Sequence, residues 1–261
     1  MSIELHSARS LTAGGRAELF NAGYEGYLLP FHVDEPMLAL MDHAFDIDLD
    51  ASRIAERDGR RVGLGNLGVR GEDAWIGGVG VVTEARRSGV GEALMRALHK
   101  QARERGIRRV WLEVIFENTG AFALYEKLGY RTVRDVEVWS LPETAEEDDS
   151  DQASEVPAAE AHARIRELRS DREPWQRADA TIENYGDARG LVTEAGAALF
   201  RATPAVQAVQ LAGETEPLLR WLRRLGAVSV LNLPVDDPAA EALRSLGAKV
   251  VVRQHEMLLE L

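Results

Sequence analysis

The sequence predicts an α/β fold, in which mixed β-sheets are flanked by helices, arranged as two similar halves. Three observations support this prediction. Apolar, strand-like segments alternate with segments whose apolar residues recur at helical spacing. An acidic segment bounded by prolines separates residues 1–141 from residues 158–261. The end of the first half recurs in the second half at a constant offset, so that Ala121 corresponds to Ala239, 118 residues later.

In the first half, each element follows from its apolar pattern and its end signals. The first helix opens at a candidate cap, Thr12, and is closed by Pro30. Gly106 ends a later amphipathic helix. The predicted elements, in order, are a strand at 3–7, a helix at 12–29, a less regular stretch with helical patches at 31–50, strands at 53–56, 62–69 and 75–83, a helix at 92–105, a strand at 109–116, a helix at 119–128 and a strand at 131–141.

The segment at residues 142–157 is expected to be a disordered linker. It is rich in Asp and Glu and nearly devoid of large apolar side chains. Such a segment cannot bury enough apolar surface to offset the entropy lost on ordering. The sequence therefore predicts two domains, at residues 1–141 and 158–261.

Composition excludes several classes of protein. The 261 residues suffice for two small domains, and the apolar fraction of 45% is ordinary for a globular protein. No apolar run approaches the roughly 20 residues that a membrane-spanning helix needs, and the N-terminus lacks the features of a signal peptide, so a cytoplasmic protein is expected. The absence of cysteine excludes disulfides and a cysteine nucleophile. The histidines show no metal-ligand spacing, so no metal site is expected.

The net charge of −12 bears on the partners of the chain. Duplex nucleic acids are bound largely through Lys and Arg that neutralise phosphates, so a nucleic-acid partner is not expected. A strongly acidic protein would instead attract cations such as amines, in a salt-dependent way. Solubility alone is the alternative explanation of the charge.

A loop at Arg86-Arg87-Ser88-Gly89-Val90-Gly91 joins a predicted buried strand to an amphipathic helix. Glycines there allow a tight turn that brings backbone N–H groups close to a ligand. The first turn of the next helix, which includes Glu92, adds unpaired N–H groups and a partial positive charge. The loop is therefore a candidate anion site. The alternative is an ordinary glycine-rich turn between a strand and a helix.

Two motifs together give the chain a resemblance to a known family. They are Arg86-x-x-Gly89-x-Gly91 after its strand, and Asn118-x-x-Ala121-x-x-Leu124-Tyr125-x-x-x-Gly129-Tyr130. In these residues the chain resembles the GNAT superfamily of N-acetyltransferases. The resemblance covers residues 75–141, whereas residues 1–74 fit only the general layout of the family. The residues from Leu112 to Asn118 look like those of bacterial enzymes that acetylate the N-terminal alanine of a ribosomal protein. Thr83 stands where the family often has proline.

The resemblance implies that acetyl-CoA is the cosubstrate, bound where a mixed sheet splays near Thr83. The pantetheine arm would bond to the backbone at Val81, Val82 and Thr83. The pyrophosphate would lie on the loop and the first turn of the next helix. Asn118 would hold the pantetheine arm, and Tyr125 would lie close to the thioester sulfur. The residues implied for the pyrophosphate are Arg86, Arg87, Ser88, Gly89, Val90, Gly91 and Glu92.

The predicted chemistry is direct attack of an amine on the acetyl group, because no cysteine is present to carry it. Glu113 is the candidate general base, and Tyr125 the candidate hydrogen-bond donor to the departing sulfur. Each has a structural alternative. Glu113 lies in an apolar strand, where a structural ion pair would equally explain it. Tyr125 shares a helix face with apolar residues and fits a core position, and Asn118 fits a helix cap.

The acceptor is expected to be a primary amine, of a small molecule or a protein. Candidates to recognise a cation come from the first helix and the stretch that follows it, although a solvated acidic face explains them equally well. They are Tyr24, Tyr27, Asp34, Asp46 and Asp48. A non-catalytic acyl-CoA sensor and transfer to a hydroxyl, or of a longer acyl group, are the other hypotheses.

The second half is predicted to be a degenerate acetyltransferase-like domain. Leu243 stands where the repeat would place Tyr125, and residues 204–209 before its helix contain neither glycine nor arginine. We expect this half to support the first, to form a homodimer, or to wall off the acceptor site.

Overall fold

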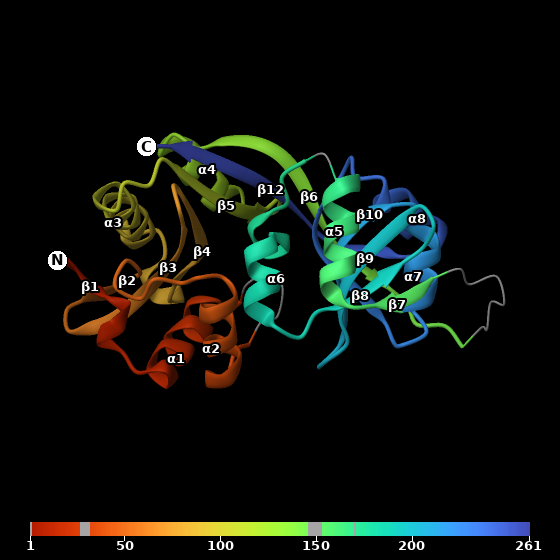
Figure 1. Ribbon diagram of the computed structural model, residues 1–261. Coiled ribbons are helices and arrows are strands. Elements are labelled where there is room, and N and C mark those ends of the chain that lie inside the picture. Colours follow the sequence, from red (N-terminus) through yellow and green to blue (C-terminus); the bar gives the residue numbers. More distant parts are fainter. Residues whose placement is uncertain (1, 27–31, 146–152, 170) are drawn as a thin grey trace. The chain divides into compact units, whose positions relative to one another are not determined.

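A computed structural model describes residues 2–26, 32–145, 153–169 and 171–261 (Figure 1). The chain divides into two compact units. The first unit comprises residues 1–133 together with 256–261, and the second comprises residues 134–255. Neither unit is therefore identical with one continuous half of the sequence. Within the described ranges, no helix is both long and apolar enough to cross a membrane.

The first unit is a mixed sheet with helices on both faces. Its strands lie in the order β1-β2-β3-β4-β5, and the end of β12 follows beside β5. Strands β1 to β4 pair antiparallel, and β4 pairs parallel with β5. The elements are β1 (Ile3–Ser7), α1 (Ala13–Gly23), α2 (Glu35–Ala44), β2 (Arg53–Arg57), β3 (Arg60–Arg70), β4 (Asp73–Val81), α3 (Val90–Glu104), β5 (Arg109–Ile115), α4 (Thr119–Lys127) and the start of β6 (Arg131–Leu141), with short 3₁₀ turns at Ala8–Ser10 and Thr83–Ala85.

Glycines bring the helices of the first unit close to the sheet. A Cβ at Gly23 of α1 would lie 2.9 Å from the backbone of Gly80 in β4. On the α3 side, a Cβ at Gly65 would lie 2.8 Å from Leu98. Helices α1 and α2 therefore cover one face and α3 the other, and α4 lies on the α3 side, as the right-handed crossovers from β4 and β5 require (Figure 1).

Sequence and structure differ at three places in this unit. The first helix ends at Gly23 and not at residue 29, and residues 27–31 lie outside the described part. The less regular stretch contains a helix, α2, which Asp34 caps by accepting from the N–H of Met37. Strand β4 ends at Val81, because Thr83 already begins a 3₁₀ turn.

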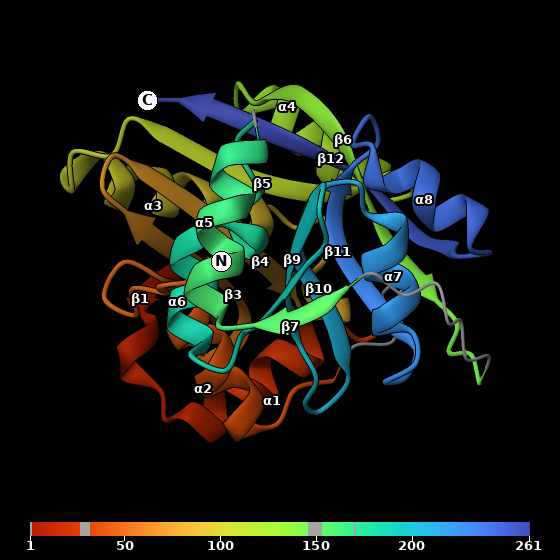
Figure 2. The same ribbon diagram turned by 45° about the vertical axis from the view of Figure 1, so that its right-hand side comes forward.

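The second unit is also a mixed sheet with helices. Its strand order is β12-β6-β11-β10-β9-β8-β7, with β10 and β11 parallel (Figure 2). Within the expected linker, Ser154–Val156 forms β7, which pairs with β8, and residues 146–152 lie outside the described part. The elements are β7, α5 (Ala158–Leu168), a 3₁₀ turn at Trp175–Arg177, α6 (Asp179–Tyr185), β8 (Arg189–Val192), β9 (Gly196–Arg201), β10 (Val206–Gly213), α7 (Glu216–Leu222), β11 (Val228–Pro234), α8 (Ala239–Ser245) and β12 (Lys249–Glu260).

The predicted repeat of the two halves is confirmed by their element order. Strand β5, helix α4 and strand β6 are matched by β11, α8 and β12. The glycines that follow the two helices, Gly129 and Gly247, both have positive φ, at 95° and 79°. This conformation suits glycine and ends a helix where the next strand must begin. The chain thus builds the same local arrangement twice.

Candidate functional site

The loop between β4 and α3 presents a row of backbone N–H groups. Gly89, with a φ of 86°, is the N-terminal cap of α3, and Arg87 also has a positive φ of 59°. In the described part of the chain, no backbone carbonyl accepts a hydrogen bond from the N–H groups of residues 87–92. A Cβ at Gly89 would meet nothing within 4 Å. These N–H groups and the helix dipole form a candidate anion site.

The loop opens onto a gap in the sheet. Strands β4 and β5 are paired only from Asp73↔Arg109 to Trp75↔Trp111, after which they part. A Cβ at Gly91 would lie 3.8 Å from Leu124 of α4 and 3.9 Å from Val81 of β4. Gly91 therefore faces the space between the end of β4 and α4. This is the region in which the sequence resemblance places a pantetheine arm, with the attached pyrophosphate at the loop.

Arginine side chains hold the loop in shape. Arg86 donates to three backbone carbonyls, those of Val81 at 3.0 Å, Gly23 at 3.2 Å and Glu25 at 2.6 Å. It thereby ties the loop to α1 while adding positive charge. At the other end of the loop, Arg57 donates to the hydroxyl of Ser88 at 2.8 Å, and this hydroxyl donates to the carbonyl of Ala85 at 2.6 Å. The expected anion ligand Arg86 thus also has a structural role.

The end of β4 is partly engaged in the sheet. The N–H of Val82 donates to the carbonyl of Val62 at 3.0 Å, and the carbonyl of Thr83 accepts from the N–H of Arg86 at 3.3 Å. The side chain of Val90 is buried beneath the loop, whereas Arg87 and Thr83 are exposed. The backbone available to a ligand is therefore mainly that of the loop and the first turn of α3.

Glu113 lies half-buried on β5, directly beyond the last pair of residues that joins β4 to β5. The indole N–H of Trp75 donates to its Oε2 at 2.8 Å. Its neighbour Trp111 donates in the same way to Asp73, at 2.9 Å. Glu113 thus has a neutral hydrogen-bond donor, which fixes the carboxylate without neutralising its charge.

Tyr125 is half-buried on α4, with its ring centroid 5.9 Å from that of Tyr130. Burial raises the pKa of Tyr130 well above its usual value. At the start of the same helix, the side chain of Asn118 accepts from the N–H of Ala121 at 3.2 Å. Asn118 is therefore a helix cap, as one of its two interpretations predicted, and this does not exclude contact with a ligand.

The acceptor candidates are not gathered in one place. Asp34 caps α2, Asp46 pairs with Arg70 at 2.6 Å, and Asp48 pairs with Arg105 at 3.0 Å. Tyr27 lies outside the described residues. Three of the four described candidates thus have structural partners that explain them.

Tyr24 is the exception, because it reaches the sheet beside the gap. Its ring stacks on Phe20, with centroids 4.5 Å apart, and its hydroxyl occupies the position that a side chain at Gly78 would take. At Gly77 and Gly78 the pairing of β4 with β3 shifts register, which is a β-bulge. The bulge, and the bond from Trp75 to Glu113, were not expected from the sequence, although two successive glycines inside an apolar strand indicate a bulge.

The second unit lacks a counterpart of the open loop. Only Glu214 and Thr215 connect β10 to α7. A Cβ at Gly213 would collide with the carbonyl of Ala195, and one at Gly196 with the carbonyl of Glu214. The short connection before α7 therefore packs directly against the turn between β8 and β9, where the N–H of Glu214 donates to the carbonyl of Ala195 at 3.0 Å. In the described ranges of either unit, no group of three metal-ligating side chains is present.

The splayed sheet, the glycine loop and the α4 motif together define an acetyltransferase-type domain. Residues 19–130 match the sequence profile of the Acetyltransferase (GNAT) family, and this part of the chain is a GNAT domain.

Two curated proteins are similar to a part of this chain. The chain is 37% identical over 59 residues to the [ribosomal protein bS18]-alanine N-acetyltransferase of Escherichia coli K12, covering 23% of this chain and 40% of that protein. It is 33% identical over 76 residues to a putative enzyme of the same description from Bacillus subtilis, covering 29% and 50%. The chain thus spans half or less of the length of these curated relatives.

Solved structures resemble the whole chain. The GCN5-related N-acetyltransferase of Sphaerobacter thermophilus superposes with a TM-score of 0.74 at 17% identity, covering 99% of this chain and 95% of that one. A tandem GNAT protein from the clavulanic acid biosynthesis pathway gives a TM-score of 0.64 at 16% identity, covering 99% and 98%. These likenesses concern the fold, and they confirm the predicted tandem arrangement.

Proposed function

We propose that the chain is an N-acetyltransferase that takes the acetyl group of acetyl-CoA to a primary amine. The observation that carries this proposal is the row of N–H groups at residues 87–92, which lies at the mouth of the gap between β4 and β5. A pyrophosphate on the loop would direct an attached pantetheine arm into that gap. The thioester supplies an activated acetyl group, and the residues of the first unit bind and orient it.

Glu113 accepts the proton of the attacking amine, directly or through water. A lysine-like amine with a pKa near 10.4 must lose a proton at a cost of about 4–5 kcal/mol at pH 7, whereas an α-amine costs about 1 kcal/mol. The fixed carboxylate beside Trp75 supports this assignment. Tyr125 donates a hydrogen bond to the departing sulfur from α4. Asn118 holds the pantetheine arm while it caps the helix.

The acceptor class follows from charge and from the relatives. The net charge of −12 favours a cationic amine. Curated relatives carry the name [ribosomal protein bS18]-alanine N-acetyltransferase, so a protein amine is a leading candidate beside small amines. We place the enzyme in the cytoplasm, where acetyl-CoA and such amines meet. The second half, in this proposal, supports the catalytic unit or forms a homodimer, and binds no cofactor of its own.

Calorimetric titration of acetyl-CoA, followed by a transfer assay on N-terminal-alanine peptides, polyamines and lysine, tests the proposal. We expect one site per chain with micromolar affinity. Tyr125→Phe should preserve binding and lower turnover at least tenfold. Absence of binding would overturn the proposal. If the parent and Tyr125→Phe bound acetyl-CoA equally well and neither transferred acetyl to any amine, the chain would be a non-catalytic acyl-CoA sensor.

A further inference from the structure

Helix α4, which carries Tyr125, is held in the first unit by shallow packing. The structure describes all of its residues, from Thr119 to Lys127, and each of them is exposed or half-buried. Its apolar side chains, among them Leu124 and Tyr125, pack against the core cluster that includes β5 without being buried in it. Because few buried contacts hold this helix, the exact place of Tyr125 depends on contacts elsewhere.

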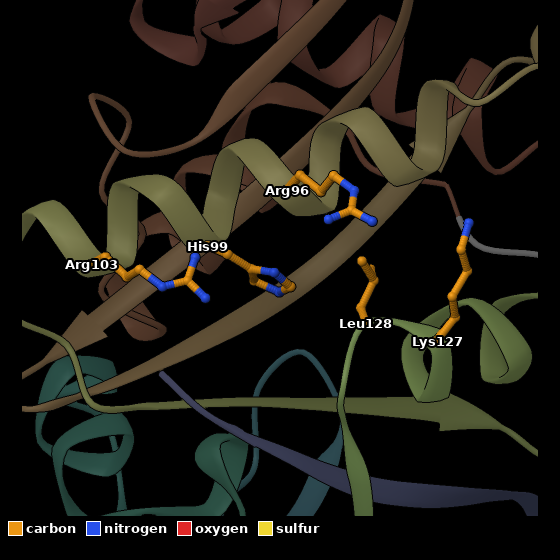
Figure 3. A pocket seen from close by; sticks show the side chains of 5 residues that line it. All are labelled: Arg96, His99, Arg103, Lys127 and Leu128. Carbon is orange, nitrogen blue, oxygen red and sulfur yellow. The ribbon is translucent and has the colours of Figure 1, made fainter.

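The end of α4 is not packed closely against α3. A pocket of about 200 Å³ lies between the two helices. Figure 3 shows that Arg96, His99 and Arg103 extend from one side of α3 toward Lys127 and Leu128 at the end of α4. Since side chains leave this space open, contacts at its border must hold the two helices together.

An exposed contact and a buried contact connect α3 to the end of α4. In the first, Nζ of Lys127 lies 2.7 Å from Oε2 of Glu92, but the side chain of Lys127 is 62% exposed, and exposed ion pairs contribute little to stability. In the second, Nε2 of His99 lies 2.9 Å from the hydroxyl of Tyr130, and both residues are buried. A buried hydrogen bond is costly to lose, so this contact fixes the end of α4 more firmly.

Tyr130 is joined to Tyr125 through both its backbone and its ring. Its N–H donates to the carbonyl of Tyr125 at 3.0 Å. Its ring centroid lies 5.9 Å from that of Tyr125 and 5.5 Å from that of His99. A continuous set of contacts therefore runs from His99 of α3 through Tyr130 to Tyr125 of α4.

Neutral groups form the hydrogen bond between His99 and Tyr130. Burial, and then the neighbouring Arg103 and Arg96, lower the pKa of His99 to about 4, whereas burial raises the pKa of Tyr130 well above its usual value. A neutral imidazole and a protonated phenol each bring a donor and an acceptor, so the bond can form in either direction. It is therefore present throughout the neutral pH range.

We infer that His99 and Tyr130 are positioning residues that hold Tyr125 at the departing sulfur. The inference rests on the proposed function, in which Tyr125 donates a hydrogen bond to that sulfur. His99 and Tyr130 touch no substrate and act through the backbone and ring of Tyr125. A hydrogen bond to the sulfur matters most where negative charge develops in the transition state. A displaced Tyr125 would therefore slow the departure of the thiolate and leave the binding of acetyl-CoA intact.

Transfer kinetics of the full chain at saturating acetyl-CoA, with an amine that the parent acetylates, test the inference. We expect Tyr130→Phe and His99→Leu to lower kcat about tenfold and to leave the affinity for acetyl-CoA, measured by calorimetry, unchanged. His99→Gln keeps a hydrogen-bonding nitrogen near the position of Nε2 and should restore most of kcat. Lys127→Gln removes the exposed contact between the same two helices and should change kcat less than twofold.

A double-mutant cycle distinguishes positioning from a general loss of stability. In the Tyr125→Phe background, Tyr130→Phe should change kcat less than twofold, because the hydroxyl that it positions is absent. Equal losses from Tyr130→Phe in both backgrounds would overturn the inference. So would an unchanged kcat of Tyr130→Phe in the parent, or an equal loss in Lys127→Gln.

The outcomes also separate this inference from the proposed function. If Tyr125→Phe lowered kcat while Tyr130→Phe and His99→Leu did not, the inference would fail and the proposed role of Tyr125 would stand. If the parent bound acetyl-CoA and acetylated no amine, the proposed function would fail, and the inference with it.

Discussion

At the scale of single residues, Trp75 of β4 and Trp111 of β5 each donate an indole hydrogen bond to a carboxylate on the other strand, but only one of these carboxylates is the proposed base. Trp75 donates to Glu113, and Trp111 donates to Asp73. Asp73 is also paired with Arg109 at the edge of the unit, at 2.8 Å, so that bond is structural. Of these two indole bonds, the one from Trp75 reaches the proposed base. We therefore infer that Trp75 positions Glu113.

Trp75→Phe should lower kcat about tenfold and leave the affinity for acetyl-CoA unchanged. The change removes the N–H that orients Glu113, and a positioning loss of about 1.4 kcal/mol corresponds to a tenfold rate. Trp111→Phe is the matched control, because it makes the same change at the partner position of the same strand pair. Steady-state kinetics and calorimetry measure the two quantities. Equal losses from both variants would assign Trp75 to the core alone.

His99 predicts a dependence of stability on pH. Burial, followed by Arg103 and Arg96, lowers its pKa to about 4, against about 6.5 in the unfolded chain. The folded state then favours the neutral ring, so its contribution to stability is complete above about pH 6.5. It is lost as the pH falls toward 4, by at most about 3 kcal/mol at about 1.4 kcal/mol per pKa unit.

His99→Gln should reduce the fall in unfolding free energy between pH 6.5 and pH 4. Urea denaturation at a series of pH values measures it. His6→Gln, at an exposed site, is the control and should keep the slope of the parent. An unchanged slope in His99→Gln would contradict the neutral, buried imidazole.

At the scale of elements, the loop before α3 depends on Gly89, whose φ of 86° favours glycine although a Cβ there would meet nothing within 4 Å. Gly89→Asp introduces a side chain and a negative charge among the N–H groups that face the anion. We expect the affinity for acetyl-CoA to fall at least about a hundredfold. Gly71→Asp is the control, because Gly71 also has a positive φ, of 56°, with nothing within 4 Å.

Both variants of this pair should lose similar stability, about 1 kcal/mol, from the positive φ alone. Thermal unfolding followed by calorimetry separates folding from binding. If Gly71→Asp weakened binding as much as Gly89→Asp, the loop would have no special part in holding the anion.

The sequence predicted most elements of the first unit, and the reason for each success is local. Periodicity and end signals suffice for α4, and for α3 beside its glycine loop. For helix α2 the sequence predicted only helical patches, although the cap Asp34 and Pro36 in its first turn are signals of a helix start. Of its large apolar residues only Leu38 is buried, so the pattern of a single core-facing stripe is weak.

The site was predictable only in part, because its remaining contacts join residues far apart in the chain. The partner of Glu113 depends on the register between two strands, which brings Trp75 opposite Trp111. No local pattern encodes that register.

At the scale of the whole molecule, the same order of elements occurs twice, but only the first unit has a glycine-capped loop before its helix. Strands part in both units, since β10 and β11 share only two paired positions, Val206↔Val228 and Gln207↔Ser229. The geometry of the gap is therefore a property of the fold. What differs is the connection before the helix, which is glycine-capped in the first unit and consists of only Glu214 and Thr215 in the second. We therefore expect a single acetyl-CoA per chain.

The end of the chain also makes the first unit depend on the second half of the sequence. Residues 256–261 belong to the first unit, where Met257 is fully buried and packs in the same core cluster as Leu112 of β5. The N–H of Leu261 donates to the carbonyl of Arg108 at 2.9 Å. Deleting residues 158–261 would therefore remove a strand from the proposed catalytic unit, whatever the second unit does.

Met257→Asp should destabilise the first unit by about 3–5 kcal/mol, because it buries an unpaired charge in that core. Val251→Asp makes a comparable change on the same strand at a position that is 51% exposed, and should cost less than about 1 kcal/mol. Urea unfolding read by acetyl-CoA binding follows the first unit selectively. If Met257→Asp lowered the free energy of unfolding as little as Val251→Asp, the last strand would contribute little to the stability of the first unit. The two halves of the sequence would then fold as independent domains.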